Sequence, residues 1–233
     1  MKTIKSNSAG RSIPYANAGL DLEKLTIKNL LAWSARDWNL SPTAILLIWL
    51  TPLIIGLIGA SAAMFGKEAY KMFTGEDKIA ENLQVLFWLL ALVLNIKLIF
   101  RISKTGQKRV AVLYGILAVG IIFLIGEEVS WGQRIFGWET SEMMKTMNKQ
   151  QETNLHNIHG VGTMFKYFHI AIGLYGTILP IIFMQLGTNF RNHEVFSWLV
   201  PHYALIPCFL TALMWRLQAT FWKPPKSLYF AVT

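Results

Sequence analysis

Charged side chains are missing from long parts of this sequence. They make up 15% of its residues, against about 25% in an average soluble domain. A helix needs about 20 mostly apolar residues, in a range of roughly 17 to 25, to cross the hydrocarbon core of a bilayer. Five stretches contain no Asp, Glu, Lys or Arg: 40–66, 82–96, 110–126, 167–190 and 195–215. Four meet this length, and 82–96 meets it when extended to residue 100, with Lys97 reaching towards the headgroups along its own stem.

Cysteine is nearly absent, since Cys208 is the only one. An intrachain disulfide is therefore excluded, and so is a metal site built from several thiolates. Alternating ten-residue strands are also missing, which excludes a membrane β-barrel and favours helices. A soluble domain with five buried helices is the alternative, but uninterrupted apolar runs of this length are uncommon in soluble cores. The first forty residues contain no apolar h-region, so we expect the first span to direct its own insertion.

We therefore predict an all-α fold, a polytopic transmembrane helical bundle of about five spans with an N-terminal interfacial helix. The interfacial helix follows from Ile27, Leu31 and Trp38, which recur at helical spacing with Leu30 beside them; packing on a partner subunit is the alternative. The predicted parts are 1–39 (cytoplasmic tail and interfacial helix), 40–126 (transmembrane helices one to three), 127–164 (a polar outer loop domain), 165–216 (helices four and five) and 217–233 (C-terminal tail).

Lysine and arginine predict the orientation. Basic residues concentrate in the first 36 residues and in the loop after the second span, and such loops face the cytoplasm. The formal net charge of +9 is explained by these span ends, so no nucleic-acid partner is expected. Five spans place the C-terminal Arg216, Lys223 and Lys226 on the outer side, against the rule. A re-entrant or additional crossing within 129–138 would remove this conflict.

Two adjacent carboxylates end the third apolar stretch, in Glu127-Glu128-Val129-Ser130-Trp131-Gly132-Gln133-Arg134. Carboxylates at the end of an apolar helix are costly unless they are solvated, paired or metal-bound. On a continuing helix, Glu127, Ser130, Trp131 and Arg134 share a face, so Glu127 pairs with Arg134 while Glu128 points elsewhere. We take Glu127, Glu128 and Arg134 as the candidate catalytic residues.

A second polar stretch contains Glu152, His156 and His159, spaced i, i+4 and i+7. On one helix this set suits zinc or iron, with Glu127 or Glu128 as a further ligand or a general base. Thr153 is a good N-cap, and a helix that starts there leaves Glu152 outside it. His169 is a further candidate for the same region. A polar network that holds helix ends together and a proton or ion path are the alternatives. Met143, Met144 and Met147 predict a short helix nearby.

The residues 127–137 (EEVSWGQRIFG) together with 152–157 (ETNLHN) resemble the signature of a family of uncharacterised bacterial multi-pass membrane proteins. The similarity covers about residues 120 to 160. It implies a bacterial inner-membrane protein and carries over no catalytic role. The chain also has a fainter likeness to membrane hydrolases of the ceramidase and progestin-receptor-like group, but it lacks their seven spans and their His-x-x-x-His pair.

Two functions are consistent with these observations, and whether the chain is an enzyme stays open. In the first, it is a non-catalytic accessory or ligand-binding subunit of a membrane complex, whose partners are the bilayer and other membrane subunits. In the second, it is a metal-dependent membrane hydrolase acting on a lipid-linked substrate. There zinc or iron on Glu152, His156 and His159 would activate water, and Glu127 or Glu128 would move the proton.

Overall fold

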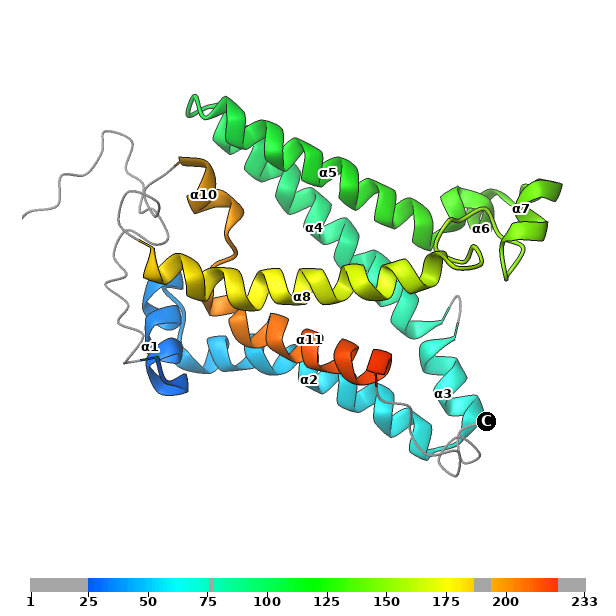
Figure 1. Cartoon of the computed structure of the whole chain (residues 1–233), viewed down its shortest axis with the longest axis horizontal. Helices are drawn as coiled ribbons and strands as arrows, with labels where there is room; N and C mark the ends of the chain where they lie inside the picture. The colour runs from blue at the N-terminus through cyan, green and yellow to red at the C-terminus, as the bar shows by residue number, and fades with distance from the viewer. Residues whose placement is uncertain (1–24, 76–77, 187–193, 222–233) are drawn as a thin grey trace, which may run out of the picture. The chain divides into compact units, whose positions relative to one another are not determined.

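The structure, a computed structural model, describes residues 25–75, 78–186 and 194–221. These ranges are helical apart from turns, loops and one isolated strand-like bridge between Asn148 and Ile158. Figure 1 shows the helices, which follow in the order α1 (Ile27–Trp38), α2 (Pro42–Met64), α3 (Lys67–Thr74), α4 (Ile79–Ser103), α5 (Lys108–Glu128), η2 (Ser130–Gly132), α6 (Gln133–Phe136), α7 (Glu142–Met147), α8 (Val161–Gln185), α10 (Glu194–Leu199), η3 (Tyr203–Leu205) and α11 (Ile206–Phe221).

Five helical segments are long and apolar enough to cross a membrane: Pro42–Ala62, Ile79–Ser103, Lys108–Glu128, Val161–Gln185 and Tyr203–Phe221. Each overlaps one of the five uncharged stretches, which confirms the prediction of an all-α, multi-pass helical membrane protein. No sixth crossing occurs within 129–138, where α6 has only four residues. Five spans therefore still place the C-terminal basic residues on the outer side, against the rule that basic residues face the cytoplasm. Residues 1–24 and 222–233, which carry part of the orientation argument, lie outside the described ranges.

The N-terminal helix α1 forms where the sequence predicts it. Its first turn is capped by Thr26, whose hydroxyl accepts a hydrogen bond from the Asn29 N–H at 3.2 Å. Leu30, Ser34 and Ala35 are buried, so this face packs on the chain itself. Ile27, which belongs to the predicted apolar stripe, is 79% exposed and remains available to a lipid surface.

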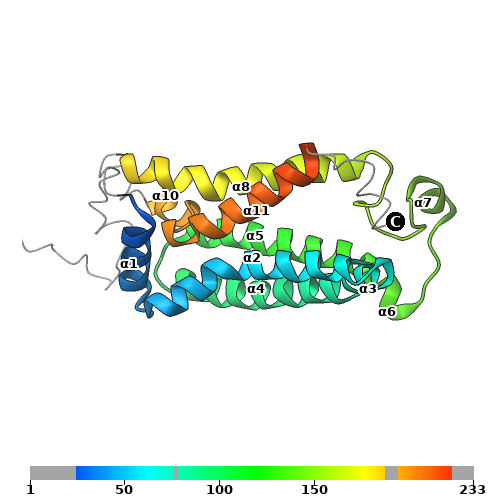
Figure 2. The ribbon, with the colours of Figure 1, turned by 90° about the horizontal axis from the view of Figure 1, so that it is seen from below.

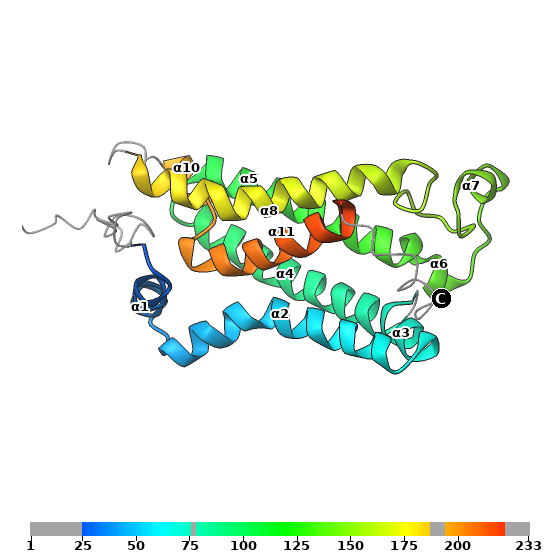
Figure 3. The ribbon, with the colours of Figure 1, turned by 60° about the horizontal axis from the view of Figure 1, so that its bottom comes forward.

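The contacts divide the chain into two compact units, and each is described by itself. The first comprises Met1–Ile54 and Ile170–Trp215. Figure 3 shows α1 lying across the start of α2. The main cluster of buried apolar residues lies there and includes Leu30, Ile45, Trp49, Phe183 and Tyr203. The indole N–H of Trp49 donates to the carbonyl of Ala204 at 2.8 Å, which joins α2 to η3.

Within the same unit, α8 and α11 lie side by side (Figure 2). Their backbones approach closely because Gly173 and Gly176 have no side chain. A Cβ atom on Gly176 would lie 2.0 Å from the ring of Phe209, and one on Gly173 would lie 2.9 Å from Leu213. Small residues at such contacts allow the close packing that holds helices together in lipid.

The second unit comprises Ile55–His169 and Arg216–Thr233. There α4 and α5 lie side by side along their length (Figure 1). Midway along them, the side-chain amide of Asn95 donates to the backbone carbonyl of Tyr114 at 3.0 Å. The segment that follows α5, residues 129–160, folds beyond the end of the helix, and we call it the cap. The predicted methionine helix is present in it as α7, capped by Ser141.

Candidate functional site

The candidate site begins with a sharp turn at the end of α5. Ser130, Trp131 and Gly132 all have positive φ angles, of 48°, 54° and 89°. Glycine suits the last position, since a Cβ atom there would also lie 3.0 Å from the ring of Trp138. The helix therefore does not continue, and the expectation that Glu127, Ser130, Trp131 and Arg134 share one helical face is wrong. The side chain of Arg134 lies outside the described part of the chain, so its pairing with Glu127 stays a prediction.

Glu127 is buried at the base of the cap, with 3% of its surface exposed. Its Oε2 accepts the backbone N–H groups of Leu155 and His156 at 2.7 and 2.9 Å. Its Oε1 accepts the indole N–H of Trp131 at 2.7 Å. Three N–H donors on one carboxylate compensate the loss of water that makes a buried charge costly. Glu127 therefore ties the end of α5 to a loop 28 residues away.

Glu128 points to a different neighbour, as its position on the helix predicts. Its carboxylate accepts a hydrogen bond from the side-chain amide of Gln84 in α4. The two adjacent acids thus serve two different contacts. Glu127 binds the cap to α5, and Glu128 binds α5 to α4.

Residues 148–160 form a loop and not a helix. Asn148 and Ile158 make an antiparallel bridge, with the Lys149 N–H donating to the Asn157 carbonyl at 3.0 Å. The helical i, i+4, i+7 geometry proposed for Glu152, His156 and His159 is therefore wrong. The segment contains three Asn and one Thr, whose side chains hydrogen-bond to the backbone and compete with helix formation.

Glu152 reaches back from this loop to the end of α5. Its Oε2 accepts the hydroxyl of Ser130 and the amide of Asn154, both at 2.7 Å. Asn154 is 1% exposed and Ser130 is fully buried. Glu127 and Glu152 thus make reciprocal contacts, one from α5 to the loop and one from the loop to α5. We call this pair of contacts the clamp.

Other amides and hydroxyls of the cap support the clamp, and the sequence analysis did not single them out. The Asn148 amide donates to the backbone and side-chain oxygens of Asn154, both at 2.8 Å. The Gln133 amide donates to the Thr140 hydroxyl at 2.6 Å, and the Gln133 oxygen accepts the Thr153 N–H at 2.8 Å. The density of Asn, Gln and Thr between residues 148 and 157 is the sequence signal from which this network could have been predicted.

The imidazole of His156 lies beside the buried carboxylate, with Nδ1 3.4 Å from Glu127 Oε2. Its ring meets the edge of Phe165 at a centroid distance of 6.5 Å. His159 contributes its backbone N–H to the Met147 carbonyl at 3.1 Å. His169 lies further along α8, where its Nδ1 is 3.2 Å from Arg216 Nη2.

No three His, Cys, Asp or Glu side chains in the described ranges come together as a metal-binding group. The structure joins Glu127 with His156, and it joins Glu152 with Ser130 and Asn154. As placed, Glu152, His156 and His159 do not form a three-ligand set. Zinc or iron at these residues stays a prediction from the sequence.

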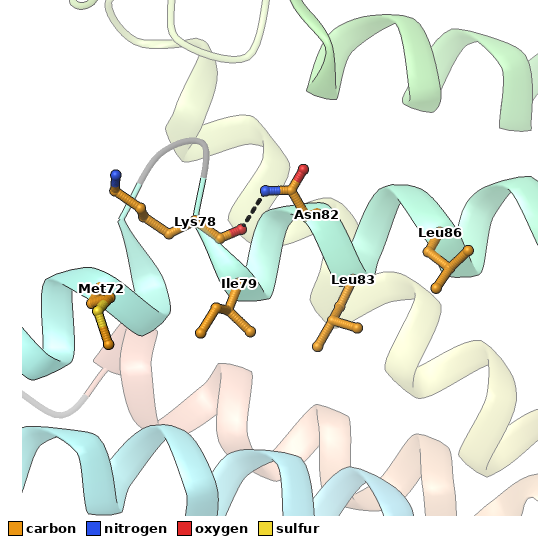
Figure 4. A pocket seen from close by; sticks show the side chains of 6 residues that line it. All are labelled: Met72, Lys78, Ile79, Asn82, Leu83 and Leu86. Carbon is orange, nitrogen blue, oxygen red and sulfur yellow. Dashed lines mark hydrogen bonds between the residues drawn. The ribbon is translucent and has the colours of Figure 1, made fainter.

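A hollow in the second unit lies elsewhere, where α3 meets α4 (Figure 4). It measures about 610 Å³ and is lined by Met72, Lys78, Ile79, Asn82, Leu83 and Leu86. Figure 4 shows the Lys78 ammonium and the Asn82 amide pointing away from the apolar side chains, and Asn82 donates to the Lys78 carbonyl at 2.8 Å. No cap residue lines this hollow, so it does not complete the polar site.

A second polar cluster, in the first unit, was largely missed from the sequence. The Tyr203 hydroxyl donates to the Asp37 carboxylate, and His202 Nε2 lies 4.0 Å from the same oxygen. Burial lowers the pKa of His202 below its usual value of 6.5, and the nearby Asp37 partly opposes this. The available signal was Asp37 itself, an acid in the last turn of α1, where the helix dipole disfavours negative charge.

Comparisons of this chain with protein-family models, with curated proteins and with solved structures find no match.

Proposed function

We propose that this chain is a non-catalytic accessory or ligand-binding subunit of a membrane complex. It would lie in the bacterial inner membrane, with its N-terminal segment in the cytoplasm and the cap on the outer side. The basic residues at the first span and after the second support this orientation. The five apolar helices support a location in a membrane but do not identify which membrane.

The clamp is the observation that carries this proposal. An ionised carboxylate offers about four acceptor positions. Glu127 uses three for Trp131, Leu155 and His156, and Glu152 accepts from Ser130 and Asn154. Acids engaged in this way stabilise a fixed shape. A metal or a reacting substrate would have to displace these donors, two of which belong to the backbone and cannot turn away.

A rigid cap is well suited to recognition. Its polar groups bind one another, while Met143 and Leu155 are 70% and 44% exposed. Such a surface is typical of a module that contacts another molecule through shape and apolar area.

The hydrolase alternative is favoured by one observation, the approach of His156 to Glu127. A carboxylate beside an imidazole is the pairing that orients a general base in many hydrolases.

Native mass spectrometry of the full chain in nanodiscs, together with metal analysis, tests the proposal. We expect a protein or lipid-like molecule bound at a fixed ratio and no stoichiometric zinc or iron. Glu127→Gln should reduce the bound partner, because it loosens the clamp. Glu142→Gln, at a cap acid that is 87% exposed, should retain it. Zinc or iron at one per chain that disappears in His156→Ala would establish the alternative, and a chain with neither partner nor metal would contradict both functions.

A further inference from the structure

The end of α5 carries an exposed apolar stripe that continues into the cap. Val112, Ile116, Val119 and Phe123 follow one another at helical spacing, and their exposed fractions are 62%, 65%, 67% and 36%. Since α5 is long and apolar enough to span a bilayer, a stripe of this kind faces lipid.

Trp131, which follows the end of the helix, packs back onto this stripe. Its ring packs edge-on against Phe123, with centroids 5.7 Å apart, and covers Gly126, where a Cβ atom would lie 2.9 Å from the indole. Phe123 precedes the last residue of α5 by five positions, about 7.5 Å along the axis. The positive φ angles of Ser130 and Trp131 thus turn the chain so that the indole lies back over the last turns of the span.

The indole of Trp131 has its polar atom bound inside the protein and its apolar ring partly exposed, as expected of a tryptophan at the membrane surface. Its N–H donates to Glu127, so its polar atom is satisfied inside the protein while 43% of the residue stays exposed. Tryptophan combines an apolar ring with one polar group, and it concentrates where hydrocarbon meets headgroups.

Three further apolar residues follow within a short length of chain. Ile135, Phe136 and Trp138 are 69%, 74% and 44% exposed, and the rings of Phe136 and Trp138 stack at 5.5 Å. Phe136 follows Glu128 by only eight residues, and four of these are in the single turn of α6. This tether keeps the group close to the membrane surface at which α5 ends.

We propose that Trp131, Ile135, Phe136 and Trp138 form a membrane-interface anchor that inserts into the headgroup region of the leaflet at which α5 ends. The occupant of this surface is the phospholipid bilayer, because the surface continues a stripe that already faces lipid. The anchor fixes the depth of the cap, so that the clamp beneath it is held at the level of the headgroups. The inference depends on the membrane-spanning fold and stands whether or not the proposed function is correct.

Spin labels on single cysteines test the anchor in the full chain reconstituted in phosphatidylcholine–phosphatidylglycerol vesicles. The background is Cys208→Ala, which removes the only native cysteine. Labels at Phe136→Cys and, separately, Ile135→Cys report on the anchor. Val119→Cys serves as the lipid-exposed reference, and Glu142→Cys, at a side chain that is 87% exposed, serves as the water-exposed cap reference.

The measurement is the ratio of collision rates with oxygen, which enters lipid, and with a water-soluble nickel chelate. We expect this ratio at positions 136 and 135 to be raised above that at 142 and shifted towards that at 119. A ratio at both positions equal to that at 142 would overturn the anchor. Labels shielded from both reagents would also overturn it, since they would indicate a protein partner on this surface.

Discussion

The carboxylate of Glu127, near the end of α5, accepts the backbone N–H of Leu155 at 2.7 Å. This contact joins two stretches that the sequence presents as separate polar motifs. The next N–H, of His156, binds the same oxygen at 2.9 Å, so the loop approaches α5 in one defined register. The cap is therefore held by backbone geometry as well as by side-chain chemistry.

Loss of the Glu127 charge should loosen the cap. Glu127→Gln keeps the shape but turns a charge-assisted acceptor into a neutral one and places an amide near backbone donors. We expect a loss of about 2 kcal/mol in the free energy of unfolding, together with faster proteolysis within 148–160. Unfolding in mixed detergent micelles measures the free energy of unfolding, and mass spectrometry of the fragments measures the proteolysis. Glu142→Gln should change stability by less than about 0.5 kcal/mol, and an equal effect of both variants would argue against the clamp.

Close packing of α8 on α11 should make Gly176 intolerant of any side chain. Gly176→Ala places a methyl group where the Phe209 ring lies 2.0 Å away, so the helices must separate, at a cost of about 1–3 kcal/mol. Gly120→Ala in α5 is the matched control, because no atom lies within 4 Å of a Cβ there. That variant should be neutral or slightly stabilising, since alanine favours the helix. Unfolding curves of both variants measure this difference in stability. Equal stability of the two variants would contradict the close packing of α8 on α11.

The contact of Tyr203 with Asp37 should hold α1 against η3. Tyr203→Phe removes the hydroxyl that donates to the carboxylate and leaves a largely buried charge with one donor fewer. Hydrogen bonds to charged groups contribute about 1.5–3 kcal/mol, and we expect a loss in this range. Asp37→Asn combined with Tyr203→Phe should cost less than the sum of the single variants. Strict additivity in this double-mutant cycle would show that the two residues do not interact.

Acidification should weaken the same region through His202. Because burial lowers the pKa of His202 from 6.5, the unfolded chain takes up a proton before the folded chain does. The contribution of His202 to stability is therefore complete above pH 6.5 and is lost as the pH falls below that value. Asp37 and Tyr203 face the imidazole, and Asp37 reduces the effect. Thermal unfolding across this range should depend less on pH in His202→Gln than in the native chain, and parallel curves would contradict the assignment.

The sequence by itself determined the class of protein and its helices. The uncharged stretches predicted all five spans, because a bilayer core admits only long apolar helices. Local signals also predicted α1, from the helical spacing of Ile27, Leu31 and Trp38, and α7, from the methionines. Each of these features depends on residues within a few helical turns of one another, so each can be recognised in a single stretch of chain.

Only the tertiary structure decided which groups the acids and histidines contact. Helical spacing grouped Glu152 with His156 and His159, but the Asn- and Gln-rich loop folds back and places Glu152 on Ser130 instead. Asp37 and Tyr203, 166 residues apart, meet only because α1 packs against η3. The physical reason is the same in both cases. A buried carboxylate is stabilised by whichever donors the folded chain places around it, and donors that are distant in sequence leave no periodic pattern along the chain.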